Sequence, residues 1–159
     1  MLETNEHMDI RIPENLKNEF SSDPIADILK RYRTVAVVGL SSDPERASNH
    51  VGEYIKSVGY RMVPVNPNER EVFGEKSYAD LESAAAAIAP AKIEIVDIFR
   101  RPENVPPVVD SAIAIGAKVI WMQLGIEHPE AAVKAASAGL VVVMDACFFV
   151  EHKRRRGSL

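Results

Sequence analysis

Five short apolar runs, spaced regularly along the chain, are the feature that most restricts its fold. They lie at residues 34–38, 60–65, 93–99, 118–123 and 140–144, and segments with helical periodicity separate them. A nearly continuous apolar run is typical of a strand that is buried on both faces, as in a parallel sheet. Strands that alternate with helices over short connections form an open sheet with helices on both faces. The sequence therefore predicts an α/β, Rossmann-like fold with an open, parallel, five-stranded sheet.

The chain of 159 residues is long enough for one domain with a substantial core. It contains no internal repeat and no low-complexity linker that would indicate a second domain. We expect residues 1–20 to form a polar N-terminal arm, residues 21–152 to form the Rossmann-like domain, and residues 153–159 to form a basic tail.

Composition bears on the partners and on the compartment. A formal net charge of −4 gives no general attraction to nucleic acid. No apolar run approaches the roughly 20 residues of a membrane helix, and the N-terminus lacks the apolar segment of a signal peptide. The single cysteine, Cys147, excludes an internal disulfide and fits a reducing compartment. We therefore expect a cytoplasmic protein that uses neither nucleic acid nor a membrane as a partner.

The loop after the first apolar run has the residues of a phosphate-binding turn. The run ends at Gly39, Ser41 and Ser42 follow, and a helix is predicted over residues 46–58. The first backbone N–H groups of a helix lack partners, and its dipole favours an anion at that end. Arg46 adds a guanidinium that can bind a phosphate. Serines replace the later glycines of the dinucleotide fingerprint, so an ordinary turn without a ligand remains an alternative.

Two further loops carry distinctive residues where ligands of open α/β sheets bind, outside the carboxyl ends of the strands. Asn66 and Pro67 follow the second run, where a nicotinamide dinucleotide site usually has an acid for the ribose. This argues against NAD and leaves room for an adenine on a proline surface. Phe99 and Arg100 end the third run and offer apolar cover and a second cation. A rigid turn and a plain charged loop are the respective alternatives.

No motif for catalysis or for metal binding is found. The sequence has no P-loop lysine, no G-x-S-x-G turn and no paired carboxylates, and its four histidines lack the spacing of metal ligands. We therefore expect a binding protein that is not an enzyme by itself.

Several segments together resemble those of the small stand-alone CoA-binding proteins, whose fold is similar to the CoA-binding domain of the succinyl-CoA synthetase alpha subunit. The most specific are Phe99-Arg100 after the third run and Trp-x-Gln-Leu-Gly at residues 121–125. The matching segments are residues 37–41, 59–60, 63–68, 96–101, 114–118, 120–125, 138–140 and 143–145. The resemblance extends over residues 25–152, although Ala146 stands where the family often has an arginine.

The resemblance implies a protein that binds coenzyme A or an acyl-CoA at the carboxyl ends of the parallel strands. By this analogy, the residues that hold phosphate are Gly39, Ser41, Ser42, Arg46 and Ser48. Asn66 and Pro67 border the nucleotide, and Ile98, Phe99 and Arg100 lie along the opposite side of the crevice.

Other functions remain open from the sequence. An NAD(P)-dependent reductase and an enzyme related to acyl-CoA ligases or transferases are the enzymatic alternatives. A third is a regulatory protein whose partner docks on the basic tail. Association into a homo-oligomer or with another protein is also left undecided.

Overall fold

A computed structural model of the chain describes residues 8–159, and its main feature is one six-stranded sheet. The strands are β1 (Asp9–Arg11), β2 (Thr34–Val38), β3 (Arg61–Val65), β6 (Ile95–Ile98), β7 (Val119–Met122) and β8 (Val141–Met144). Their order across the sheet is β1-β8-β7-β6-β2-β3. The five strands from β2 to β8 run parallel, whereas β1 is antiparallel to β8. A short hairpin of β4 (Glu71–Val72) and β5 (Glu75–Lys76) stands apart from this sheet.

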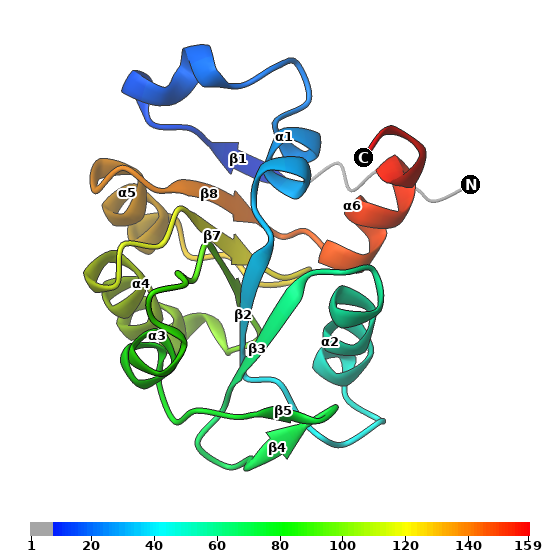
Figure 1. Ribbon diagram of the computed structural model, residues 1–159. Coiled ribbons are helices and arrows are strands. Elements are labelled where there is room, and N and C mark those ends of the chain that lie inside the picture. Colours follow the sequence, from blue (N-terminus) through cyan, green and yellow to red (C-terminus); the bar gives the residue numbers. More distant parts are fainter. Residues whose placement is uncertain (1–7) are drawn as a thin grey trace.

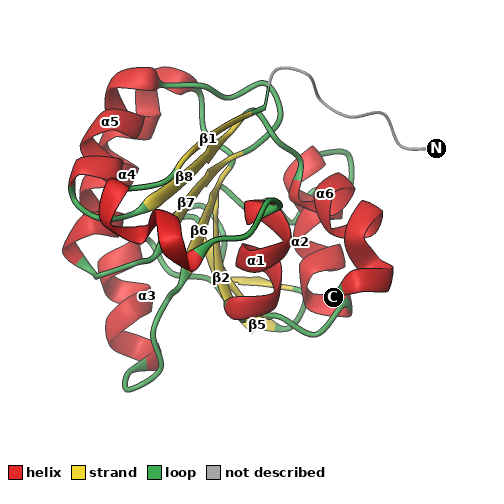
Figure 2. Cartoon of the chain, turned by 90° about the horizontal axis from the view of Figure 1, so that it is seen from above, coloured by secondary structure: helices red, strands yellow, loops and turns green. Residues whose placement is uncertain are grey.

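Helices cover both faces of the sheet (Figures 1 and 2). One face carries α3 (Leu81–Ile88), α4 (Val105–Ala114) and α5 (Pro129–Ser137), and the other carries α1 (Pro24–Arg31), α2 (Ala47–Ser57) and α6 (Phe148–Arg155). The 3-10 helices are η1 (Glu14–Glu19), η2 (Pro102–Asn104) and η3 (Arg156–Ser158). Successive strand residues point to opposite faces, so Ile95 packs in one core cluster and Val96 in the other. None of the helices in residues 8–159 is long and apolar enough to cross a membrane.

The five predicted parallel strands are confirmed, but the expected number of strands was too low by one. The missed strand, β1, lies within the segment that we expected to be an arm, and Ile10 pairs with Val143 of β8. Its three residues are too few to show a strand period. The part of the arm that the structure describes packs on the core through apolar side chains, namely Met8, Ile10, Ile12, Leu16 and Phe20. Residues 1–7 lie outside the described part of the chain.

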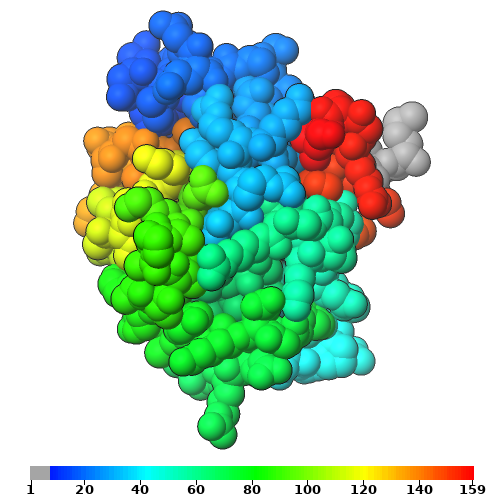
Figure 3. Space-filling model, viewed as in Figure 1, coloured from blue at the N-terminus to red at the C-terminus, as the bar shows by residue number. Residues whose placement is uncertain are grey.

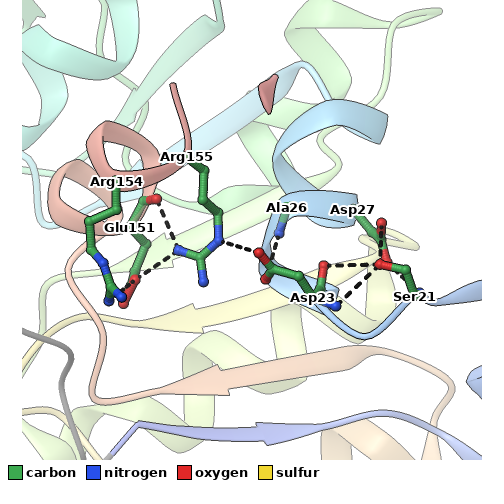
Figure 4. Close-up of polar contacts among 7 residues, drawn as sticks. All are labelled: Ser21, Asp23, Ala26, Asp27, Glu151, Arg154 and Arg155. Atoms are coloured by element: carbon green, nitrogen blue, oxygen red, sulfur yellow. Dashed lines mark hydrogen bonds and ion pairs between the residues drawn. The ribbon is translucent and has the colours of Figure 1, made fainter. Parts of the chain in front are cut away.

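The expected basic tail begins inside a helix. Lys153 and Arg155 belong to α6, whose buried side includes Phe148 and His152, four residues apart. Arg155 joins this helix to α1: its Nε donates to Asp23 Oδ2 at 2.8 Å, and its Nη1 donates to Glu151 Oε2 at 2.9 Å (Figure 4). This helix was not predicted from the sequence because many of its residues are charged and only one side of it is buried.

The order of the strands determines where a cleft can form. From β2 the chain moves to β3 on one side and afterwards to β6 on the other side, so the loops after β2 and β6 diverge from neighbouring strand ends. Such a switch point is where open α/β sheets bind ligands. In Figure 1 the loop after β2 and the β4–β5 hairpin lie at the same, lower edge of the sheet. In Figure 3 the N-terminal segment (dark blue) and α6 (red) lie at the other end of the molecule.

Candidate functional site

Gly39 connects β2 to its loop at a point where the backbone of β6 passes very close. Its N–H donates to Val65 O at 2.8 Å, and its φ is +89°. A Cβ at this position would overlap the carbonyl oxygen of Phe99. The close approach places the turn after β2 directly against the end of β6, and it requires glycine.

Buried polar side chains determine the shape of the loop that follows. Ser41 N donates to Ser48 Oγ at 3.1 Å, and Asn49 Nδ2 donates to Ser41 O at 2.9 Å. Asn66 Nδ2, from the end of β3, donates to Leu40 O at 2.9 Å. Ser48 and Asn66 are both buried, and their bonds to the loop backbone stabilise its conformation.

The N-terminus of α2 opens into the same region without a capping side chain. Arg46 occupies the N-cap position and provides no side-chain hydrogen bond to the helix, and the first turn contains no acidic residue. Free N–H groups at the start of an eleven-residue helix attract an anion through their partial positive charge.

These elements border an open cleft of about 680 Å³. Seven of the predicted site residues line it: Gly39, Ser41, Arg46, Ser48, Asn66, Phe99 and Arg100. Arg101 also lines the cleft, so three guanidinium groups surround it. None of the three forms an ion pair with a residue in the described range 8–159. A cavity with unpaired cations and free helix N–H groups is suited to a polyanion.

Three predicted residues lie elsewhere. Ile98 is fully buried, because its side chain points into the core beneath α3 and α4. Ser42 is exposed and bonds to Glu69. Pro67 lines a second, mostly apolar cavity of about 230 Å³, which shares Arg100 with the main cleft. Val38, Val65, Leu81 and Val108 complete much of its apolar lining.

The prediction missed several cleft residues: Asn68, Glu69 and Ile126 come from loops, and Asn104 ends η2. Glu69 is the most consequential of them. Its Oε1 accepts from Ser42 N at 3.0 Å and from Ser42 Oγ at 2.9 Å. The expected place for an acid was the end of β3, where Asn66 stands, but the loop after β3 brings a carboxylate back to the cleft. In the sequence, Glu69 is an acid thirty positions after Gly39. Only the folded structure shows that its side chain reaches the cleft.

A third cavity of about 400 Å³ adjoins the main cleft through Pro102, which lines both. Gly125, Glu127 and Asp145 form the rest of its lining. Asp145 Oδ1 accepts from Gly125 N at 2.6 Å and so joins the loops after β7 and β8. The cleft therefore continues along the strand ends toward β8.

One fully buried carboxyl group does not line the cleft. Asp97, on β6, is fully buried, and neither of its oxygens has a hydrogen-bond partner. Burial raises the pKa of this carboxyl well above its usual value, which favours the protonated form in the folded protein.

The fold and the cleft define the class: a doubly wound α/β domain with an open cleft at its switch point. A family model described as "CoA binding domain" matches residues 33–153. The chain belongs to this family.

The chain is also similar to proteins of similar length. The uncharacterized protein YneT of Bacillus subtilis (strain 168) is 37% identical over 128 residues, which are 80% of this chain and 91% of YneT. A hypothetical protein from Pyrococcus horikoshii OT3 has a similar structure, with 38% identity, a TM-score of 0.78, and 97% and 98% of the two chains covered. Prb, a PH1109 protein redesigned for binding, has 41% identity and a TM-score of 0.79 over 88% of this chain and 95% of its own.

Proposed function

We propose that the cleft binds coenzyme A or an acyl-CoA and that the chain is not an enzyme by itself. The observation that carries this proposal is the convergence of Arg46, Arg100 and Arg101, all without ion-pair partners in residues 8–159, on the uncapped start of α2. Coenzyme A is an elongated polyanion with a pyrophosphate and a 3′-phosphate, so it needs several cationic or amide donors. The family of the chain supports the same ligand.

The three cavities suggest how such a ligand lies. The pyrophosphate binds at the start of α2, close to Arg46, because the helix dipole and the guanidinium both favour it. The adenine occupies the apolar cavity beside Pro67 and next to Arg100. The pantetheine arm passes Phe99 and Ile126 toward the cavity at Gly125, where an acyl group would reach solvent.

Calorimetric titration tests this proposal with coenzyme A, acetyl-CoA and NADH as ligands. Coenzyme A and acetyl-CoA are expected to bind saturably. Arg100→Ala and Arg46→Ala are each expected to weaken this binding about tenfold, because each removes one charge-assisted hydrogen bond. Arg61→Ala is the matched control, since Arg61 is an exposed cation at the opposite end of β3.

Two results would contradict the binding part of the proposal. One is the absence of heat from coenzyme A and acetyl-CoA at millimolar concentration. The other is saturable binding of NADH alone, which would favour the dinucleotide alternative. Turnover of acetyl-CoA, followed as release of free thiol, would contradict the non-catalytic part of the proposal.

A further inference from the structure

Glu69 is the one acidic side chain among the residues that line the main cleft. It lies on the loop between β3 and β4 and is partly buried. Both bonds from Ser42 end on its Oε1, which fixes the carboxylate against the phosphate-binding loop. No lysine or arginine of residues 8–159 forms an ion pair with it. The cleft therefore contains one carboxylate at a fixed position, without a direct ion-pair partner in residues 8–159.

The neighbours of Glu69 indicate which part of a nucleotide it would meet. Asn66 and Asn68, from the same loop, line the cleft beside it, and Pro67 between them lines the apolar cavity that we assign to the base. The proposed pyrophosphate position is at the start of α2, which is joined to the same turn by the bond from Ser41 N to Ser48 Oγ. A ribose joins the base to the pyrophosphate, so we expect it to pass near Glu69, which bonds to Ser42 and is two positions from Pro67.

A carboxylate distinguishes two forms of a ribose by simple chemistry. An ionised carboxylate accepts hydrogen bonds and cannot donate them. It therefore binds the free hydroxyl groups of a ribose and repels a phosphate attached to one of them. A glutamine at the same position keeps an accepting oxygen and removes the repulsion.

We propose that Glu69 is a specificity-determining residue of this cleft, which disfavours a phosphate on the ribose relative to free ribose hydroxyls. The proposal rests on the nucleotide binding proposed above. It names a ligand preference within that function: Glu69 lowers the affinity for coenzyme A, which carries a 3′-phosphate, relative to 3′-dephospho-CoA, which does not.

The test compares these two nucleotides by calorimetry on the full chain. Glu69→Gln is expected to strengthen the binding of coenzyme A relative to 3′-dephospho-CoA by about tenfold, because one like charge is removed close to the phosphate. Its amide oxygen can still accept from Ser42, so the loop keeps its conformation. Glu71→Gln is the matched control: it removes the same charge from an exposed residue, at the start of β4, that does not line the cleft, and is expected to leave the ratio unchanged.

Two results would overturn the inference while nucleotide binding stands. The first is that neither Glu69→Gln nor Glu71→Gln changes the affinity for coenzyme A relative to 3′-dephospho-CoA. The second is a Glu69→Gln protein that binds both nucleotides more tightly by the same factor, which would place the carboxylate at the pyrophosphate. If wild-type protein and both variants bind neither nucleotide, the proposed function fails, and this inference fails with it.

Discussion

Gly39 determines the distance between the two loops that border the cleft. Its amide is bonded to β3, and its α-carbon faces the carbonyl of Phe99 at the end of β6. Any side chain there would push the turn after β2 away from Arg100 and so widen the cleft. The residue thus contributes to the shape of the cleft, which it also lines.

Gly39→Ala is expected to destabilise the protein by about 2–4 kcal/mol, since a left-handed φ and a backbone clash add together. Gly116→Ala is the control. Gly116 has a φ of +75°, but nothing lies within 4 Å of its Cβ position, so only about 1 kcal/mol should be lost. Urea unfolding of both variants measures the difference. Equal losses would show that the approach to Phe99 is looser than the structure indicates.

Among the elements, α6 shows how a charged segment becomes part of the fold. Glu151 is 1% exposed and is therefore costly to bury without a partner. Arg155 supplies that partner and also pairs with Asp23, the N-cap residue of α1, whose side chain accepts from Ala26 N (Figure 4). One guanidinium therefore joins the buried acid of α6 to the first turn of α1.

Arg155→Gln is expected to lower the free energy of unfolding by about 1–3 kcal/mol, because it leaves Glu151 with a single, longer contact to Arg154. Lys30→Gln removes an exposed cation from α1 and should change stability by less than about 0.5 kcal/mol. Thermal or urea unfolding compares the two. A loss in Arg155→Gln no larger than that in Lys30→Gln would show that the joint between α1 and α6 does not stabilise the domain.

At the scale of the whole molecule, the sheet buries an acid in its centre. Asp97 is flanked by Val37 on β2 and Trp121 on β7. Its pKa is raised by burial, so the folded state holds a proton that the unfolded chain releases near pH 3.8. Between that pH and the folded-state pKa, the folded protein binds more protons than the unfolded protein. Stability therefore falls as the pH rises through this window, by about 1.4 kcal/mol per pH unit for one group.

Asp97→Asn removes this titration while it keeps the shape of the protonated acid. We expect the variant to be increasingly more stable than wild type as the pH is raised from 4 to 7, measured by urea unfolding at several pH values. Parallel pH profiles of the two proteins would show that Asp97 is ionised in the folded state or solvated through local opening.

Several features of the fold and the site were predictable because they depend on local sequence. The apolar runs predicted the five parallel strands, which are observed as β2, β3, β6, β7 and β8. Gly39, Arg46 and Arg100 were placed at strand ends or a helix start, and they line one cleft. Ile98 does not line the cleft, because it still belongs to β6, whose side chains are buried on both faces of the sheet, and it packs in the core with α3 and α4.

The sequence by itself determined the alternating strands and helices, because periodicity and turn residues act within a few positions of one another. Only the tertiary structure decided that β1 pairs with β8, that the cation run of α6 packs on α1, and that Glu69 reaches Ser42 across 27 positions. Each of these contacts joins residues distant in sequence. These contacts depend on which surfaces pack together when the sheet forms, and a local sequence pattern does not determine that packing.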